Sequence, residues 1–288
     1  MAKRALVLSG GGVKGAYQVG ALKKWLLEDN LDYEILTGVS VGALNVAFLS
    51  QAKLGEISDA YAKLLKLWNT VDDGKVFKKW KPFGYIESLW QDSVLNSDPL
   101  LAWLKRDLDE ALIAGSGREV RVGATSWDTG EYRLASQSDV DFHRWVAASA
   151  SFPIFLSPVK IDGQKWTDGG IRNVTPLAEA IRLGAEEIDV IMCSNPDLPT
   201  DWDPKKKHAV PDYVLRAFDL MSDQIMRADL KICGAKNEIA ERSGSYKQIK
   251  LRLLQPDVKL VEDSLSFDRL AIQKMIVKGY EDACRLAT

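Results

Sequence analysis

The chain has 288 residues, of which 46% are hydrophobic and 27% are charged, and its formal net charge is −2. These values are ordinary for a globular protein that buries a substantial core, and the near-neutral charge argues against nucleic acid as the main partner. The cysteines Cys193, Cys233 and Cys284 are widely spaced and odd in number. This spacing favours neither a disulfide framework nor a zinc site, and it indicates a reducing compartment.

The first residues lead almost directly into a short apolar run that glycines interrupt, which is unlike a secretory signal peptide. The sequence contains no run of the roughly 18 uncharged apolar residues that a membrane-spanning helix needs. We therefore expect a cytoplasmic protein, with peripheral attachment to a membrane surface as the alternative location.

The first predicted elements are a buried strand at residues 5–8, a helix at 16–27 and a second strand at 33–36. The first strand and helix enclose the sequence Gly10-Gly11-Gly12-Val13-Lys14-Gly15. A glycine turn between a strand and a helix start binds anions, because free backbone N–H groups and the helix dipole both point at the turn. Gly10, Gly12 and Gly15 also have the spacing of the dinucleotide-binding fingerprint, so both ligand classes remain open at this point.

The second strand runs into Gly38-Val39-Ser40-Val41-Gly42, and a helix is expected from residue 41 to 49 and onward through 56–71. The pattern G-x-S-x-G between a strand and a helix is typical of a nucleophile elbow, in which a strained serine exposes its hydroxyl. The alternative is that Ser40 only caps the helix. A dinucleotide site would need an acidic residue at the end of this strand, and the sequence has none there.

Residues 68–115 are rich in aromatic residues, and lysines are interleaved with them in the first part. The aromatic residues are Trp68, Phe77, Trp80, Phe83, Tyr85, Trp90 and Trp103, and the lysines are Lys75, Lys78, Lys79 and Lys81. We expect a helical flap that packs on the core and covers the site, with one helix at 99–114. Segments of this composition also bind at lipid interfaces, with the aromatic rings at the boundary and the lysines on anionic headgroups.

Two hairpins are predicted next, at residues 118–136 and 158–170, with a helix at 141–149 between them. Helices at 175–183, about 213–241 and 267–286 then alternate with strands at 188–193 and 247–254. This order predicts a single α/β domain over residues 1–288, with three α/β/α layers and a mainly parallel central sheet. Its C-terminal part, about 210–288, should be mostly helical.

A nucleophilic serine needs a base, and the chain has only two histidines. His143 stands at a helix start, where a surface or packing role is expected, and His208 stands in a lysine-rich loop that includes Lys205, Lys206 and Lys207. A triad of Ser40, Asp168 and His208 is formally open. The other candidate is Asp168 alone, since a carboxylate on a glycine turn in a partly dry site gains basicity. Asp168-Gly169 could also be an ordinary turn.

The glycine loop, the elbow and Asp168-Gly169-Gly170, in this order, resemble the motifs of the patatin-like phospholipase family. Residues 147–159, the "NVTP" at 173–176 that comes after Gly170, and "GYEDA" at 279–283 fit the same family. The resemblance covers about residues 4–195 well and the remainder loosely. It implies a patatin-like fold and a lipid acyl hydrolase of the phospholipase A, lysophospholipase or esterase type.

The resemblance also implies a catalytic dyad of Ser40 and Asp168 that needs no histidine, metal or cofactor. An acyl ester attacked by Ser40 develops an oxyanion, and the loop would hold it with the backbone of Gly10, Gly11, Gly12 and Val13. The supporting residues are Lys14, Gly15, Gly38, Gly42, Gly169 and Gly170. Lys14 would fix the loop or add positive potential near a phosphate headgroup, unless it is only a solvated lysine.

Two other functions stay open for the same motifs. A transacylase would pass the acyl group from Ser40 to an alcohol instead of water, and a catalytically silent member would serve as a scaffold. The expected partner is a phospholipid or another acyl ester, with peripheral contact to a membrane surface and no nucleic acid. The sequence assigns no oligomeric state.

Overall fold

The computed structural model describes residues 2–82, 84–195, 197, 205, 207, 209–243, 248–261 and 264–286. The strands are β1 Arg4–Leu8, β2 Ile35–Val39, β3 Glu119–Ser126, β4 Tyr132–Ser136, β5 Val159–Ile161, β6 Gln164–Asp168, β7 Glu187–Ile191 and β8 Lys250–Leu254. The α-helices are α1 Gly15–Leu22, α2 Val41–Leu49, α3 Ile57–Trp68, α4 Asp73–Val76, α5 Asp98–Asp107, α6 Glu110–Ala114, α7 Phe142–Ser149, α8 Leu177–Arg182, α9 Val210–Ser243 and α10 Arg269–Leu286.

All these strands join one sheet, in the order β5-β6-β3-β2-β1-β7-β8, with β4 paired to β3. Strands β3, β2, β1, β7 and β8 run parallel to one another, whereas β4 and β6 pair antiparallel with β3, and β5 pairs antiparallel with β6. The predicted α/β class is therefore confirmed, with a sheet that is parallel through its centre and mixed at one side.

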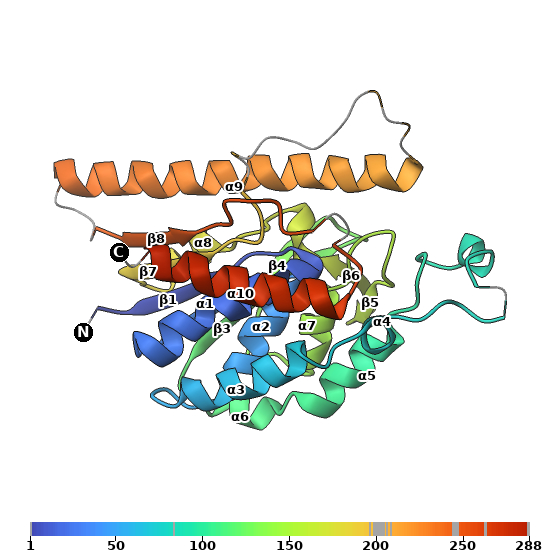
Figure 1. Ribbon diagram of the computed structural model, residues 1–288, viewed down its shortest axis with the longest axis horizontal. Coiled ribbons are helices and arrows are strands. Elements are labelled where there is room, and N and C mark those ends of the chain that lie inside the picture. The colour runs from blue at the N-terminus through green and yellow to red at the C-terminus, as the bar shows by residue number, and fades with distance from the viewer. Residues whose placement is uncertain are drawn as a thin grey trace.

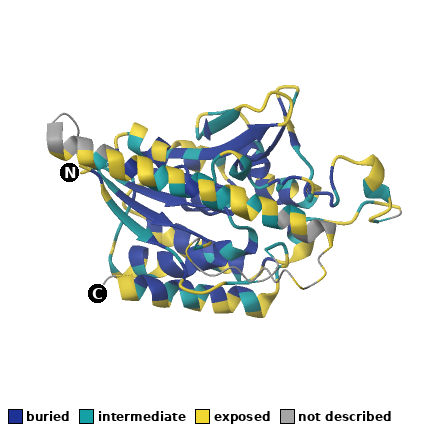
Figure 2. Ribbon diagram, turned by 90° about the horizontal axis from the view of Figure 1, so that it is seen from above, coloured by how far each residue is buried: buried dark blue, intermediate teal, exposed yellow. Residues whose placement is uncertain are grey.

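Helices cover both faces of this sheet (Figure 1). The strand β1 alternates between them: Leu6 and Leu8 pack into the larger core with α1, α2, α3, α5, α7 and α10, whereas Ala5 and Val7 pack into the smaller core with α8 and α9. This alternation follows from the two-residue period of a strand. Figure 2 shows the buried sheet between its exposed outer helices.

The strand β3 pairs with one strand, β4, along its first edge and with two strands, β2 and β6, along the other. Residues Arg121–Thr125 pair with β4 on the first edge. On the opposite edge, β2 pairs along β3 as far as Gly123, and β6 takes over from Ala124 onward. The short strand β6 therefore continues the sheet directly beyond the carboxyl end of β2, where the elbow begins.

Three predicted helices differ from those in the structure. The helix expected from 41 through 71 is two helices, α2 and α3, and Gly55 with φ +94 lies in the connection. The helix expected at 99–114 divides into α5 and α6 at Asp109, whose side chain caps α6 by accepting from the amides of Ala111 and Leu112. The first helix continues beyond α1 as a π-helical segment, η2 Lys23–Glu28.

The predicted flap at 68–115 is helical only in part. Beyond α4, the described residues of 77–97 form an irregular arm that contains the short 3-10 helix η3 Glu87–Trp90. Pro82 and Gly84, which has φ +63, lie in this segment, and its aromatic residues lack the 3.6-residue period of a packed helix. Phe83 lies outside the described residues, as do Lys206 and His208.

The helix α10 packs along α1 (Figure 1), and the Tyr17 hydroxyl donates to Asp282 Oδ2 at 3.0 Å. Asp282 belongs to the "GYEDA" sequence, so this motif fastens the last helix to the one that follows the glycine loop. Within the part of the chain that is described, no helix combines the length and the apolar character needed to cross a membrane.

Candidate active site

Ser40 occupies a sharp turn between β2 and α2, with φ 56 and ψ −127. This backbone conformation is strained for a residue with a side chain. The flanking glycines are required by close approach: a Cβ on Gly38 would lie 2.4 Å from the carbonyl carbon of Gly42, and one on Gly42 would lie 2.2 Å from the Leu8 oxygen. The Ser40 side chain makes no capping hydrogen bond, so the geometry favours the nucleophile elbow over a helix cap.

Two serines outside the three expected motifs accept hydrogen bonds from the backbone amides of Ser40 and Asp168. The Ser40 amide donates to Ser149 Oγ at 2.9 Å, and the Asp168 amide donates to the Ser151 carbonyl at 3.0 Å. Both serines belong to the 147–159 block that resembles the family, but no local pattern gave their roles. The end of α7 thus positions both candidate catalytic residues from one side.

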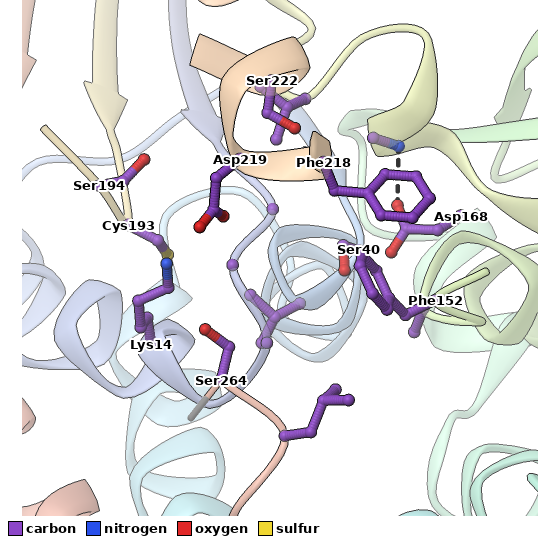
Figure 3. A pocket seen from close by; sticks show the side chains of 18 of the residues that line it. Lys14, Ser40, Phe152, Asp168, Cys193, Ser194, Phe218, Asp219, Ser222 and Ser264 are labelled. Atoms are coloured by element: carbon purple, nitrogen blue, oxygen red, sulfur yellow. Dashed lines mark hydrogen bonds between the residues drawn. The ribbon is translucent and has the colours of Figure 1, made fainter. Parts of the chain in front are cut away.

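Asp168 is the last residue of β6, and only 2% of it is exposed. Its Oδ1 accepts from the Gly170 amide at 2.7 Å, and its side chain faces Ser40 (Figure 3). Burial raises the pKa of the Asp168 carboxyl to about 7, although hydrogen bonding from Ser40 and Gly170 lowers this pKa in part. A carboxyl with this pKa suits a general base near neutral pH.

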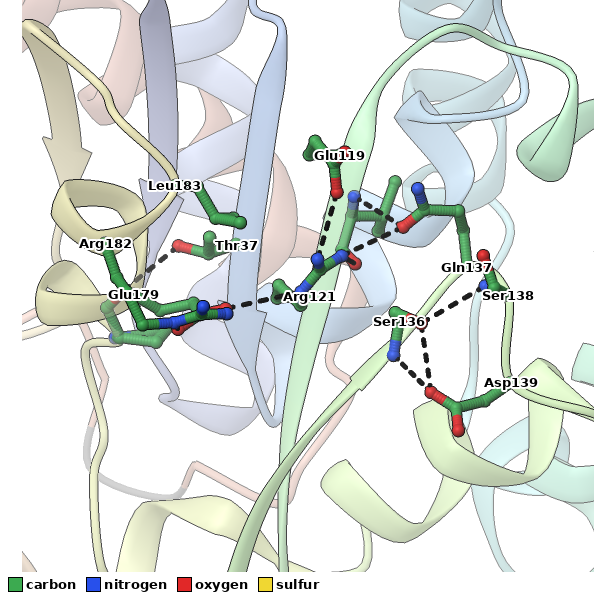
Figure 4. A network of polar contacts seen from close by, with 12 residues as sticks. Thr37, Glu119, Arg121, Ser136, Gln137, Ser138, Asp139, Glu179, Arg182 and Leu183 are labelled. Carbon is green, nitrogen blue, oxygen red and sulfur yellow. Dashed lines mark hydrogen bonds and ion pairs between the residues drawn. The ribbon is translucent and has the colours of Figure 1, made fainter.

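A polar network anchors β3, the strand with which both β2 and β6 pair (Figure 4). The Arg121 guanidinium contacts Glu119 at 3.0 Å and Glu179 of α8 at 3.3 Å, and it donates to Gln137 at 3.1 Å. Glu179 also receives two hydrogen bonds from Arg182, each 2.7 Å long. The network links β3 to α8 and to the segment after β4.

The glycine loop lies beside Ser40, since a Cβ on Gly10 would be 3.1 Å from the Ser40 Cβ. Two of the four amides predicted for the oxyanion hole already have acceptors: Gly10 donates to Val174 at 3.0 Å and Val13 donates to Ser264 at 2.8 Å. Among the described residues, the Gly11 and Gly12 amides have no acceptor. They are therefore the two amides of the loop that are left for an oxyanion.

Two segments that are distant in sequence pack closely against this loop, and this close packing requires glycine at positions 11 and 12. A Cβ on Gly11 would lie 2.3 Å from the Cys193 Cβ. Gly12 has φ +58, and a Cβ there would lie 2.2 Å from the Ser264 oxygen. The loop is thus held between the end of β7 and the segment that precedes α10, and neither contact leaves room for a side chain.

A cavity of about 850 Å³ extends from Ser40 and Asp168. One part of its wall is apolar and is formed by Val41, Leu44, Phe48, Leu67, Trp68, Val71, Val76, Phe77, Leu100 and Trp103. Another part is polar and includes Lys14, Ser194, Asn195, Arg216, Asp219, Ser222, Asp223 and Ser264. The cavity that holds Ser40 and Asp168 thus combines an apolar chamber with a charged one. In Figure 3, Lys14 and Asp219 lie on one side of Ser40, and the rings of Phe152 and Phe218 lie on the other.

Lys14 belongs to the charged part of the wall and is half-buried. Its positive charge lowers the pKa of the Asp223 carboxyl, although burial of that carboxyl is the larger effect and raises its pKa. In the described part of the chain, the Lys14 ammonium forms no hydrogen bond or ion pair. The remaining supporting residues lie where the motifs place them, with Gly15 at the start of α1 and Gly169 and Gly170 in the turn η4 Gly169–Ile171.

The histidines lie elsewhere or outside the described residues. His143 Nδ1 contacts Glu110 Oε1 at 2.6 Å, and His143 is absent from the cavity wall. His208 lies outside the described residues. The end of β2 carries Ser40 and no carboxylate, so a ribose anchor is missing there. Among the described residues, no cluster of three His, Cys, Asp or Glu side chains is arranged to hold a metal.

Comparisons with known proteins find similar sequences and a similar fold. The family model of the patatin-like phospholipases matches residues 6–181. The chain is 24% identical over 272 residues to the uncharacterized protein YjjU of Escherichia coli strain K12, and the match covers 89% of this chain and 66% of YjjU.

In fold, the chain is similar to the crystal structure of VipD from Legionella pneumophila. The TM-score is 0.51 at 14% identity, and the match covers 99% of this chain and 66% of VipD. The chain thus spans just under two thirds of the length of each of these proteins.

Proposed function

The chain belongs to the patatin-like phospholipase family, and from this premise we propose that it is a lipid acyl hydrolase with a Ser40–Asp168 dyad. The observation that carries the proposal is the pairing of a strained, half-buried serine with a buried carboxyl whose pKa burial raises to about 7. The adjoining cavity supports an acyl substrate because its wall is apolar on one side of this pair.

In the proposed reaction, ionised Asp168 accepts the hydroxyl proton of Ser40 while Oγ attacks the ester carbonyl carbon. The carbonyl oxygen becomes an oxyanion that accepts hydrogen bonds from the Gly11 and Gly12 amides. Collapse of this intermediate breaks the ester C–O bond, and Asp168 returns the proton to the leaving alkoxide. The products of this half-reaction are an alcohol and an acyl-Ser40 enzyme.

Water then repeats the sequence in the opposite direction. Asp168 takes a proton from the water, whose oxygen attacks the acyl carbonyl, and the second oxyanion occupies the same amides. When this intermediate collapses, Ser40 Oγ leaves and regains the proton from Asp168. The acyl group departs as a free carboxylic acid, and the enzyme returns to its initial state.

The two parts of the cavity suit the two parts of a lipid. The apolar wall between α2, α3 and α5 would take the acyl chain, because burying its methylene groups is favourable. The charged wall would take the headgroup, and the Lys14 ammonium would lie near a phosphate. This division favours phospholipids and lysophospholipids over uncharged short esters as substrates.

The test is turnover of a fluorogenic phospholipid and of a short soluble ester by the wild type, Ser40→Ala and Asp168→Asn. Both substitutions should abolish release of free acid while the protein stays folded, and His208→Ala should leave it unchanged. Loss of activity in His208→Ala would support the triad instead. Retained activity in Ser40→Ala would contradict the proposal, and transfer of the acyl group to an added alcohol would identify a transacylase.

A further inference from the structure

The arm at residues 77–97 leaves the body of the protein between α4 and α5 (right side of Figures 1 and 2). Its tip carries four large apolar side chains that contact solvent: Tyr85 is 56% exposed, Ile86 63%, Leu89 77% and Trp90 73%. These residues stand at and beside η3. Such a cluster on the surface marks an interaction site, because isolated exposed apolar residues are ordinary but contiguous ones are not.

The base of the arm is firmly attached to the body. Lys78 and Asn96 exchange two backbone hydrogen bonds, each 2.9 Å long, and the Leu95 amide donates to Phe155 at 2.9 Å. The Trp80 indole donates to the Ser93 carbonyl at 3.0 Å and so joins the two sides of the arm. The apolar tip is therefore held away from the core by a closed base.

The charges at the tip of the arm sum to a small net positive charge, because Lys79 and Lys81 outweigh Glu87 of η3. Asp92 forms an ion pair with Lys165 at 3.0 Å, and Lys78 forms one with Asp98 at 3.4 Å. Lys79 lies 4.7 Å from the centre of the Tyr85 ring. In the described part of the arm, Lys79 and Lys81 have no anionic partner. Exposed apolar side chains beside such lysines complement an anionic lipid surface.

The arm also adjoins the candidate active site. Phe77 at the start of the arm lines the cavity, and Leu156, which bridges to Leu95 at the end of the arm, lines it as well. If the tip contacts a bilayer, the cavity lies beside that bilayer. A lipid could then move from the membrane into the apolar chamber over a short path.

We propose that the tip formed by Tyr85, Ile86, Leu89 and Trp90, with Lys79 and Lys81, inserts into the interface of an anionic lipid bilayer and docks the protein there. The inference rests on the proposed function only in that the substrate is then drawn from the docked membrane. A bilayer suits this convex projection better than a protein does, because stable protein interfaces bury about 800 Å² on each partner. The aromatic and aliphatic side chains would reach the acyl boundary and the lysines would contact the headgroups.

The experiment measures co-sedimentation with vesicles of phosphatidylcholine and of equal parts phosphatidylcholine and phosphatidylserine. All proteins carry Ser40→Ala, so that the vesicles stay intact. The arm variant Leu89→Ser/Trp90→Ser should bind both vesicle types at least about tenfold more weakly, because two inserting side chains are lost. The matched control is Leu112→Ser, at an exposed leucine of α6 (46% exposed) on the body, and it should bind as its parent does.

The charge variant Lys79→Gln/Lys81→Gln tests the lysines separately. Its binding to the phosphatidylserine vesicles should fall by about fivefold for each lysine, and its binding to pure phosphatidylcholine should stay unchanged. Added salt should also weaken the binding of the parent to the anionic vesicles. Circular dichroism of every variant checks that it is folded.

Three outcomes would overturn the inference: no vesicle binding by the parent, equal binding by the parent and the arm variant, or a change in oligomeric state with the arm variant while vesicle binding persists. The last would identify the tip as a protein interface. Hydrolysis of a monomeric soluble ester separates this question from the catalytic one. With Ser40 restored, arm variants should keep that hydrolysis within about twofold, because the tip lies outside the cavity wall.

Discussion

Ser40 and Asp168 meet at consecutive positions along one edge of β3. Val39, which precedes Ser40, pairs with Gly123, and Asp168 pairs with the next residue, Ala124. The aspartate thus comes to the serine because β6 continues the sheet where β2 ends. A backbone register, rather than side-chain contacts, sets the distance between the two residues, so that it depends on the most rigid part of the fold.

The rate of ester hydrolysis should rise with pH around neutrality, because only the ionised carboxyl of Asp168 accepts the serine proton. Burial raises the pKa of Asp168 to about 7. Below about pH 6, kcat/KM for a soluble ester should therefore fall about tenfold per pH unit. A pH–rate profile measures this directly. A midpoint of this profile at about pH 4, the ordinary pKa of aspartate, would contradict a buried base with a raised pKa.

The same carboxyl should make the protein less stable as the pH rises. The pKa of Asp168 is raised from 3.8 to about 7 in the folded state, so between these values the unfolded chain is ionised and the folded protein keeps its proton. The contribution of Asp168 is fully present below about pH 4 and falls by roughly 1.4 kcal/mol per pH unit up to about pH 7.

Asp168→Asn removes this titration and provides the check. Between about pH 5 and pH 8, the free energy of unfolding of the variant should gain about 2–3 kcal/mol relative to the wild type. Urea denaturation at the two pH values measures the difference. If the difference between the two proteins is the same at both values, Asp168 does not carry the raised pKa.

The strain at Ser40 should appear in the stability of two substitutions. Ser40 has φ 56, which glycine adopts without the steric cost that alanine retains. The free energy of unfolding of Ser40→Gly should therefore exceed that of Ser40→Ala by about 1 kcal/mol. Ser50 at the end of α2 is the control, because its φ is −71 and there the glycine variant should be the less stable one. If the alanine variant is more stable than the glycine variant at both positions, the backbone at Ser40 is not strained.

The apolar chamber should set the preferred acyl length. Trp103 of α5 lines the cavity and stacks on Phe48 with ring centroids 5.7 Å apart. Trp103→Leu enlarges the chamber, so the optimum in a series of esters should move to longer chains. Trp145→Leu is the matched control, since Trp145 is also buried in the core but is absent from the cavity wall. An unchanged optimum in Trp103→Leu would place the acyl chain elsewhere.

The parts of the site that the sequence indicated are those with local causes. At Gly38 and Gly42, a single Cβ would collide with backbone, so the elbow has a short and recognisable pattern. The hairpin that ends at Asp168 has an equally local turn signal. The order of strands and helices gave the α/β class because alternation along the chain is enough to predict it.

The parts that the sequence did not indicate depend on distant contacts. The Val13 amide donates to the Ser264 carbonyl, and the Gly10 amide donates to the Val174 carbonyl. The spacing of residues within the glycine loop does not reveal either hydrogen bond. Ser149 and Ser151 act through folded geometry in the same way. The arm was expected to be helical from its composition, but its exposed aromatic residues have no core partner that would impose a helical period.

The central claim is that Ser40 is a nucleophile that Asp168 activates, and covalent labelling with a fluorophosphonate tests it most directly. The wild type should be modified on the peptide that contains Ser40, with a labelling rate that rises through about pH 7 as Asp168 ionises. Asp168→Asn should label far more slowly at every pH, and Ser40→Ala should remain unlabelled. An unmodified Ser40, or equal labelling of the wild type and Asp168→Asn, would contradict the dyad.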